Sequence, residues 1–383
     1  MQKKPTSAYV HIPFCTQICY YCDFSKVFIK NQPVDSYLEH LLQEFHSYDI
    51  QKLRTLYIGG GTPTALSAPQ LELLLDGLTK NLDLSVLEEL TIEANPGDLD
   101  ADKIAVLKNS AVNRVSLGVQ TFDDKMLKKI GRSHLEKDIY ENIDRLKLAG
   151  FDNISIDLIY ALPGQTMDQV KENVAKAIAL DIPHMSLYSL ILENHTVFMN
   201  RMRRGKLPLP KEELEAEMFE YIISKLEKAG FEHYEISNFS KPGFESRHNL
   251  MYWDNAEYYG IGAGASGYVN GVRYKNHGPI RHYLSFQFLL RQRQFPSSHT
   301  IHKDRVIFQY QAIETHVGNI QPNGLNHIVL NLLHSLTRQC INQVNRDIVK
   351  TSQLQAVDIF INILLQMTAP NLFQHLVIKC LHA

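Results

Sequence analysis

Three cysteines lie within eight residues near the start of the chain, in the stretch FCTQICYYCDF. Cys15, Cys19 and Cys22 have the spacing C-x3-C-x2-C, which is too tight for conventional disulfide pairing. Three thiolates can bind three irons of a [4Fe–4S] cluster and leave the fourth iron open for another ligand. A structural zinc site needs a fourth protein ligand. The spacing therefore favours an iron–sulfur cluster, and a zinc site is the alternative.

The elements that must position these cysteines form a repeating pattern of short apolar runs and amphipathic segments. Most of the runs are continuous and rich in Val, Ile, Leu or Tyr, as in parallel strands that are covered on both faces. Strands that alternate with helices form right-handed βαβ units. The expected strands span residues 7–13, 53–60, 87–95, 113–120, 153–160 and 184–191, and the expected helices 34–48, 68–82, 136–150, 167–180 and 211–230. Six such units predict an α/β fold, a partial (βα)6 TIM-like barrel.

Polar residues and glycines mark the ends of the expected strands, where a parallel barrel carries its functional residues. The stretch YIGGGTPTAL (57–66) ends the second strand, and its glycines let backbone N–H groups approach a ligand closely. A tight turn explains the same glycines. Glu93, Gln120, Arg132 and Asp157 lie at or near later strand ends. Each alone is typical of a surface or capping residue, but together they predict one polar mouth.

The cysteine spacing, after a first strand that reads YVHIPFC, resembles the radical S-adenosylmethionine (SAM) superfamily. In that superfamily the open iron binds the amino and carboxylate groups of SAM, and reduction cleaves SAM to a 5′-deoxyadenosyl radical. The resemblance therefore implies SAM as a second cofactor. It assigns Gly60, Gly61 and Thr62 to contact with SAM, at its methionyl end, and it places Tyr9 at the same site.

Three further stretches, IEANPGD, SLGVQTF and IDLIYALPGQT, are similar to the porphyrin-related branch of this superfamily. The resemblance covers residues 7 to about 280. That branch uses equivalents of Glu93, Gln120, Arg132 and Asp157 to bind SAM. It contains two kinds of protein. One is the oxygen-independent coproporphyrinogen III dehydrogenase, which forms protoporphyrinogen IX by oxidative decarboxylation, and the other is the HemW type of heme chaperone.

Two features distinguish these possibilities. The dehydrogenase carries a further cysteine two residues past the third, where this chain has Phe24. The stretch RHNLMYW contains an HNxxYW motif that resembles the chaperone signature, with His248 as the candidate axial ligand of heme. An imidazole can bind iron, and Tyr252 and Trp253 can stack on a flat macrocycle. Alone, a histidine beside two aromatic residues is usually structural. With the other motifs it favours a heme chaperone over the dehydrogenase.

The resemblance also implies a partner, an acceptor hemoprotein that receives the heme, and respiratory enzymes in membranes are such acceptors. The net charge of −2 gives no reason to expect nucleic-acid binding. The N-terminus lacks the apolar region of a signal peptide, and no apolar run reaches the roughly 18–20 residues of a membrane span. We therefore expect a cytoplasmic protein without a transmembrane segment, which delivery to a respiratory enzyme would bring to the membrane periphery.

The composition changes at residue 285. Residues 1–284 contain 37 acidic and 31 basic side chains, whereas residues 285–383 contain 4 and 8. Family members continue into a helical C-terminal domain rich in acidic residues, and no stretch here matches it. We expect a radical SAM partial barrel over 1–235, a closing segment with the HNxxYW motif over 236–284, and a mainly helical or poorly defined region over 285–383. A shifted reading frame is the hypothesis for this departure, and resequencing codons 280–290 tests it.

Overall fold

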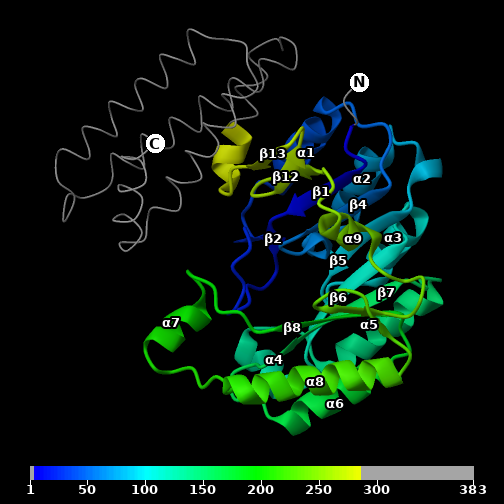
Figure 1. Ribbon diagram of the computed structural model, residues 1–383. Helices are drawn as coiled ribbons and strands as arrows, with labels where there is room; N and C mark the ends of the chain where they lie inside the picture. The colour runs from blue at the N-terminus through cyan, green and yellow to red at the C-terminus, as the bar shows by residue number, and fades with distance from the viewer. Residues whose placement is uncertain (1–3, 286–383) are drawn as a thin grey trace, which may run out of the picture. The chain divides into compact units, whose positions relative to one another are not determined.

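The computed structural model describes residues 4–285, so the predictions for residues 286–383 lie outside the described residues. A nine-stranded sheet forms its centre, in the order β11-β1-β4-β5-β6-β7-β8-β10-β9 (Figure 1). The six strands from β1 to β8 in this order run parallel to one another. They are β1 (Ser7–Ile12), β4 (Thr55–Gly60), β5 (Glu89–Ala94), β6 (Arg114–Gln120), β7 (Ile154–Tyr160) and β8 (His184–Ser189). The α/β fold with six parallel strands is as predicted.

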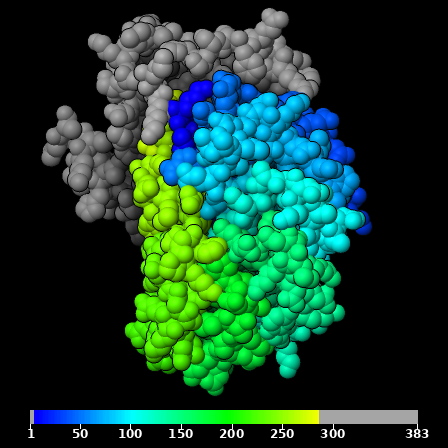
Figure 2. Space-filling model, turned by 90° about the vertical axis from the view of Figure 1, so that its right-hand side faces the viewer, coloured from blue at the N-terminus to red at the C-terminus, as the bar shows by residue number. Residues whose placement is uncertain are grey.

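Helices connect the parallel strands and pack against one another in sequence order. Helix α1 contacts α2, α2 contacts α3, α3 contacts α5, and α6 contacts α8. Figure 2 shows successive units side by side, as bands that run from blue through cyan to green. The helices are α1 (Val34–Ser47), α2 (Ala68–Thr79), α3 (Ala101–Asn109), α4 (Asp124–Ile130), α5 (Glu136–Leu148), α6 (Met167–Ala179), α7 (Val197–Arg203) and α8 (Glu212–Lys228), with 3₁₀ turns at Pro63–Ala65 and Leu84–Val86.

The apolar patterns of strands and helices meet in one continuous core. All seven residues of β6 are buried, as expected for a central parallel strand. Helix α5 buries Ile139, Ile143 and Leu146, which recur at helical spacing on one face. These side chains belong to the same apolar cluster as the strands and the other outer helices. The polar residues of the sheet are thereby held on a rigid frame.

The closing segment adds strands to both ends of the parallel sheet. Strand β10 (Asn238–Ser240) is antiparallel to β8 and pairs with β9 (Glu232–His233). Strand β11 (Tyr259–Ile261) is parallel to β1, and a hairpin of β12 (Ser266–Val269) and β13 (Val272–Lys275) follows it. Helix α9 (Arg247–Trp253), which carries the HNxxYW motif, contacts β4. In the sheet, β11 and β9 are the two end strands and do not pair with each other.

Four short helices were not expected from the sequence: α3, α4, α7 and α9. Each begins after a residue whose side chain accepts a hydrogen bond from a backbone N–H of the first turn, such as Asp100 before α3 and Ser246 before α9.

None of the helices between residues 4 and 285 combines the length and the apolar character needed to cross a bilayer.

Candidate functional site

The three cysteines lie on a loop at the carboxyl end of β1. Strand β2 (Phe14–Cys15) pairs with β3 (Val27–Phe28), so the two ends of the loop are fastened together. The ring of His11 contacts the carbonyl oxygen of Ser25 at 2.7 Å and braces the later part of the loop. Cys15 is buried, whereas Cys19 and Cys22 are partly exposed. The cysteines therefore lie at the carboxyl end of a parallel strand, where such a fold carries its functional residues.

The thiols are free and lie within electrostatic reach of one another. Burial raises the pKa of the Cys15 thiol to about 11, and a hydrogen bond from Thr62 opposes this rise, while Cys22 and Cys19 add to it. In residues 4–285, no three His, Cys, Asp or Glu side chains are grouped to hold a metal ion. A cubane cluster takes one thiolate for each iron, so its cysteines surround it rather than meet at one point. The loop therefore offers three thiols, and three thiolates are the ligands that a [4Fe–4S] cluster with one open iron needs.

The glycines at the end of β4 and directly after it make room beside this loop. Gly60 has a φ of +118°, and an added Cβ would lie 2.6 Å from Nδ1 of His11. A Cβ on Gly61 would lie 2.7 Å from the carbonyl oxygen of Phe14 and 3.0 Å from the sulfur of Cys15. The strand end can approach the cysteine loop this closely only because it carries no side chains. This bare backbone fits close contact with a ligand such as SAM.

Glu93 of β5 joins the glycine turn to a neighbouring tyrosine. Its Oε2 accepts a hydrogen bond from the backbone N–H of Gly60 at 3.1 Å, and its Oε1 accepts one from the hydroxyl of Tyr57 at 2.7 Å. Burial raises the pKa of the Glu93 carboxyl to about 7, the two hydrogen bonds oppose the rise, and Asp157 adds to it. The site therefore contains a carboxyl group that changes its charge near neutral pH.

Arg132 links the cysteine loop to two strand ends. Its guanidinium donates to the hydroxyl of Tyr21 at 2.9 and 3.2 Å, and to the side-chain oxygen of Asn95. The amide of Asn95 donates to the hydroxyl of Thr62 at 2.9 Å, and that hydroxyl lies 3.8 Å from the sulfur of Cys15. Tyr21, Arg132, Asn95 and Thr62 thus form one hydrogen-bond network that ends at Cys15.

The remaining predicted residues lie on the same sheet. Gln120 ends β6 with a φ of +68° after an irregularity in its pairing, and it is buried. Asp157 of β7 accepts from the hydroxyl of Ser116 at 3.3 Å, and burial raises the pKa of its carboxyl. The hydroxyl of Tyr9 contacts His11 at 2.9 Å. None of these contacts is with a ligand, so the assignments to SAM stay predictions.

Helix α9 is anchored by a carboxylate of the neighbouring sheet. Glu89 of β5 accepts hydrogen bonds from the backbone N–H groups of Arg247 and His248 at 2.8 and 3.1 Å, and from the hydroxyl of Ser246 at 3.2 Å. These bonds satisfy N–H groups that have no partner within the helix. The motif helix is thereby held at the start of β5, with His248 facing β4.

The ring of His248 is 2% exposed, and both of its nitrogens have a polar neighbour. Nδ1 lies 2.9 Å from the hydroxyl of Thr55, and Nε2 lies 3.1 Å from the hydroxyl of Tyr252. Burial lowers the pKa of the imidazole to about 3, so it is neutral at physiological pH. The predicted axial ligand is thus present as a neutral imidazole, but in this structure the Tyr252 hydroxyl occupies Nε2.

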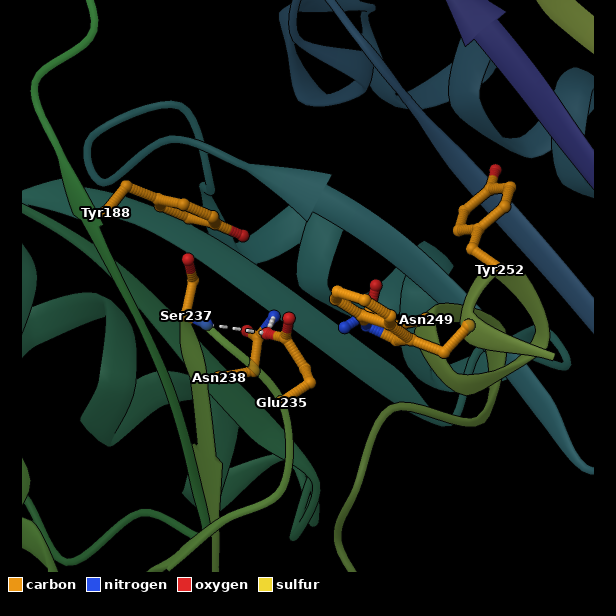
Figure 3. A pocket seen from close by; sticks show the side chains of 7 residues that line it. Tyr188, Glu235, Ser237, Asn238, Asn249 and Tyr252 are labelled. Atoms are coloured by element: carbon orange, nitrogen blue, oxygen red, sulfur yellow. Dashed lines mark hydrogen bonds between the residues drawn. The ribbon is translucent and has the colours of Figure 1, made fainter. Parts of the chain in front are cut away.

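A cavity of about 340 Å³ opens beside this helix. Three aromatic side chains that line it are partly exposed, Tyr188 of β8 (44%) and Tyr252 and Trp253 of α9 (40% and 54%). Figure 3 shows Tyr188 and Tyr252 on opposite sides, with Glu235, Ser237, Asn238 and Asn249 between them. Aromatic walls with a few polar groups are typical of sites for flat organic ligands. Tyr252 belongs both to this cavity and to the hydrogen bond with His248.

Sequence reasoning missed Tyr57, Asn95, His11 and Glu89. A signal existed for Tyr57, because Tyr9 and Tyr57 are partners in the parallel pairing of β1 and β4, and their rings stack at 6.1 Å. Asn95 lies two residues after Glu93, and thus at the same strand end. The role of Glu89 depends on a helix 158 residues later in the chain, for which no local signal exists.

Comparison with known proteins agrees with this geometry. Residues 9–177 match the model of the radical SAM superfamily, which is the predicted superfamily and implies a [4Fe–4S] cluster and SAM as cofactors. Coproporphyrinogen III oxidase (HemN) from Escherichia coli, described as a radical SAM enzyme, has a similar fold. The TM-score is 0.65 at 24% identity, over 74% of this chain and 69% of that one.

Curated relatives resemble the chain more strongly. The heme chaperone HemW of Lactococcus lactis is 64% identical over 284 residues, which is 74% of this chain and 75% of the relative. The proteins of the same name from Bacillus subtilis and Escherichia coli are 50% and 38% identical, over 76% and 69% of this chain and 77% and 70% of theirs. The chain therefore belongs to the family of the heme chaperone HemW, within the radical SAM superfamily.

Proposed function

We propose that this protein is a heme chaperone that binds a [4Fe–4S] cluster, SAM and heme, and passes the heme to an acceptor hemoprotein. The observation that carries the proposal is the position of the HNxxYW helix. It forms one wall of an aromatic-lined cavity, and it holds a neutral imidazole directly behind the wall residue Tyr252. The similarity to proteins named heme chaperone HemW supports the same function.

Cys15, Cys19 and Cys22 are the proposed ligands of the cluster. When bound, the cluster and SAM supply the radical chemistry of the superfamily. The proposed residues for SAM are Tyr9, Gly60, Gly61, Thr62, Glu93, Gln120, Arg132 and Asp157. The glycines expose backbone N–H groups, and the carboxylate of Glu93 can accept hydrogen bonds from an ammonium group or from ribose hydroxyls. Arg132 holds Tyr21, and so the middle of the cysteine loop, in place.

Heme is proposed to bind in the cavity of Figure 3, with His248 as its axial ligand. The hydroxyl of Thr55 donates to Ser7 at 2.9 Å, so it accepts the proton of His248 Nδ1. The lone pair of Nε2 then points to Tyr252, whose hydroxyl donates to it. A histidine that binds metal through one nitrogen usually donates its other N–H in this way. Ligation therefore requires the departure of the Tyr252 hydroxyl from Nε2.

An anaerobic hemin titration of the cluster-loaded protein tests this proposal. We expect a saturable one-to-one change in the Soret absorbance that is lost or strongly altered in His248→Ala. Tyr252→Phe should bind hemin at least as tightly as the original protein, because it removes the group that competes for Nε2. Weak, non-saturating binding that is the same in all three proteins would contradict the proposal.

The alternative function, coproporphyrinogen III dehydrogenase, uses the same proposed SAM residues. The side chain at the position of its additional cysteine is Phe24, which is 65% exposed and has no metal-binding atom. Product analysis with coproporphyrinogen III under anaerobic, reducing conditions separates the two functions. The chaperone predicts no protoporphyrinogen IX, and its formation at catalytic rates would favour the dehydrogenase.

The acceptor is proposed to be a hemoprotein of the respiratory chain. Such an acceptor can be membrane-bound, which would bring the chaperone from the cytoplasm to the membrane surface during transfer. None of the described helices is long and apolar enough to span a membrane. Co-purification of heme-loaded protein with membranes that contain or lack apo-acceptor tests this part of the proposal.

A further inference from the structure

Tyr57 of β4 contacts both halves of the site. Toward the proposed SAM residues, its hydroxyl donates to Oε1 of Glu93 at 2.7 Å. The other oxygen, Oε2, accepts from the backbone N–H of Gly60. A Cβ on Gly59 would lie 2.8 Å from both the Glu93 carboxyl and the Tyr57 ring, so both side chains cross the bare backbone there. A ligand that bonds to Oε1 therefore competes with the Tyr57 hydroxyl for the lone pairs of this oxygen.

Toward the proposed heme residues, the ring of Tyr57 packs on the ring of His248. The two ring centres are 5.2 Å apart, with an angle of 30° between the planes. The other neighbour of Tyr57 is the ring of Tyr9, stacked at 6.1 Å. Tyr57 thus contacts two aromatic rings and has a hydrogen bond at its hydroxyl, and these three contacts hold it in position. Since the imidazole lies against this ring, a change in the position of Tyr57 changes the packing of His248.

The proposed function requires two arrangements of the imidazole. In the structure, Nε2 lies 3.1 Å from the hydroxyl of Tyr252. In the heme-bound state of the proposed function, the lone pair of this nitrogen binds iron and the Tyr252 hydroxyl has left. A bistable element of this kind can be biased from either side, by a ligand that reaches Tyr57 or by heme.

We propose that Tyr57 is a positioning residue that couples the SAM site to the heme ligand. SAM bonds to Glu93 and takes the oxygen that holds the Tyr57 hydroxyl. The released ring then allows His248 to leave Tyr252 and bind heme iron. SAM and heme therefore bind with positive cooperativity, and each tightens the other by the same factor. This inference rests on the proposed heme chaperone function and names how its two ligands are linked.

The test is a hemin titration with and without saturating SAM, under anaerobic conditions and with the cluster oxidised, so that SAM is not cleaved. In the unmodified protein, we expect SAM to tighten hemin binding about fivefold or more, within the usual range of coupling between sites. Hemin should tighten SAM binding by the same factor in the reciprocal titration. A ratio of one in both titrations would overturn the proposal without any variant.

The variant Tyr57→Phe keeps the ring on His248 and removes the hydroxyl. We expect it to bind hemin without SAM as tightly as the unmodified protein does with SAM, and we expect SAM to add less than twofold. Its heme spectrum should keep the features of a histidine ligand, because the imidazole is retained. If Tyr57→Phe shows the full SAM effect, the coupling does not run through this hydroxyl and the proposal is wrong.

Tyr234→Phe is the matched control. The Tyr234 hydroxyl also contacts a buried histidine, Nε2 of His184 at 2.8 Å, and it accepts from the backbone N–H of Ser246 rather than donating to Glu93 as Tyr57 does. We expect its SAM effect to equal that of the unmodified protein, and loss of the effect there would overturn a specific role for Tyr57. Failure of the function is distinguishable: non-saturating hemin binding would reject the chaperone, whereas saturable binding without a SAM effect would reject only the coupling.

Discussion

Two buried histidines are held in nearly the same way in two regions of the molecule. His184, on β8, has Nδ1 at 2.7 Å from the hydroxyl of Ser155 and Nε2 at 2.8 Å from that of Tyr234. His248, on α9, has the hydroxyls of Thr55 and Tyr252 in the same two positions. Both rings are almost fully buried, at 1% and 2% exposure, and burial lowers the pKa of both.

The difference lies in the two tyrosines. The Tyr234 hydroxyl also accepts the backbone N–H of Ser246 at 3.2 Å, so its departure would leave two buried partners unsatisfied. Tyr252 lines the aromatic cavity and is 40% exposed. One pair is therefore a fixed support of the sheet, whereas the other can open toward a ligand. Burial alone therefore does not distinguish the two histidines. They differ in whether the tyrosine that contacts Nε2 can move away.

The largest expected effect on stability comes from His184→Ala. Removal of this ring leaves a cavity, and it takes one hydrogen-bond partner from the buried hydroxyl of Ser155 and one from the hydroxyl of Tyr234. We expect the free energy of unfolding to fall by about 3 kcal/mol, measured by urea denaturation of the apoprotein. The matched variant His248→Ala should lose less, because Tyr252 can turn its hydroxyl toward solvent. Equal losses would erase the distinction between the two pairs.

The two histidines should also make the fold sensitive to acid. Their pKa is lower in the folded than in the unfolded state, so the unfolded state binds more protons below about pH 6.5. Stability is then complete above this pH and falls on acidification, by about 1.4 kcal/mol per pH unit for each histidine. Chemical denaturation of the apoprotein between pH 7 and pH 5 measures the slope, which His184→Ala and His248→Ala should each reduce.

Glu93 acts in the opposite direction over part of this range. Its pKa of about 7 lies above the ordinary value, so the folded state binds the extra proton and stability falls as pH rises from about 4.5 to 7. Glu93→Gln removes this opposing contribution. We expect it to steepen the loss of stability on acidification, and an unchanged slope would contradict the raised pKa.

The smallest expected effects come from the hydroxyls alone. Tyr234→Phe leaves both the N–H of Ser246 and Nε2 of His184 without a partner, and should cost about 1–2 kcal/mol of unfolding free energy. Tyr252→Phe removes the partner of one group, Nε2 of His248, beside an open cavity. It should lower the unfolding free energy by less than about 1 kcal/mol. Urea denaturation of the two variants side by side measures the difference. A greater loss in Tyr252→Phe would reverse the assignment of fixed and displaceable pairs.

The comparison also shows what the sequence could and could not predict. The six parallel strands were predictable to within about two residues at each end because buried parallel strands are continuous apolar runs. The short helices α3, α4, α7 and α9 were missed because seven to nine residues give too little periodic signal. The polar residues at the strand ends were expected to meet, since the carboxyl ends of parallel strands share one edge.

The contacts that distinguish the two histidines could not be predicted. Thr55 and His248 are 193 residues apart in the chain, and only the packing of α9 against β4 brings them together. Tyr57 begins the stretch YIGGGTPTAL, but its role comes from the register of three neighbouring strands, which the stretch does not show. The HNxxYW motif identified His248 through resemblance, but its burial and its hydrogen bond to Tyr252 are tertiary facts.

The central claim is that His248, and not another buried histidine, is the ligand that heme displaces from a tyrosine. The most direct test is nitrogen hyperfine spectroscopy of ferric heme bound to protein labelled with ¹⁵N-histidine, beside the same label in His248→Ala and Tyr234→Phe. The account predicts ¹⁵N coupling to iron in the unmodified protein and in Tyr234→Phe, and none in His248→Ala. Coupling that persists in His248→Ala would show that another histidine binds the iron and would contradict the account.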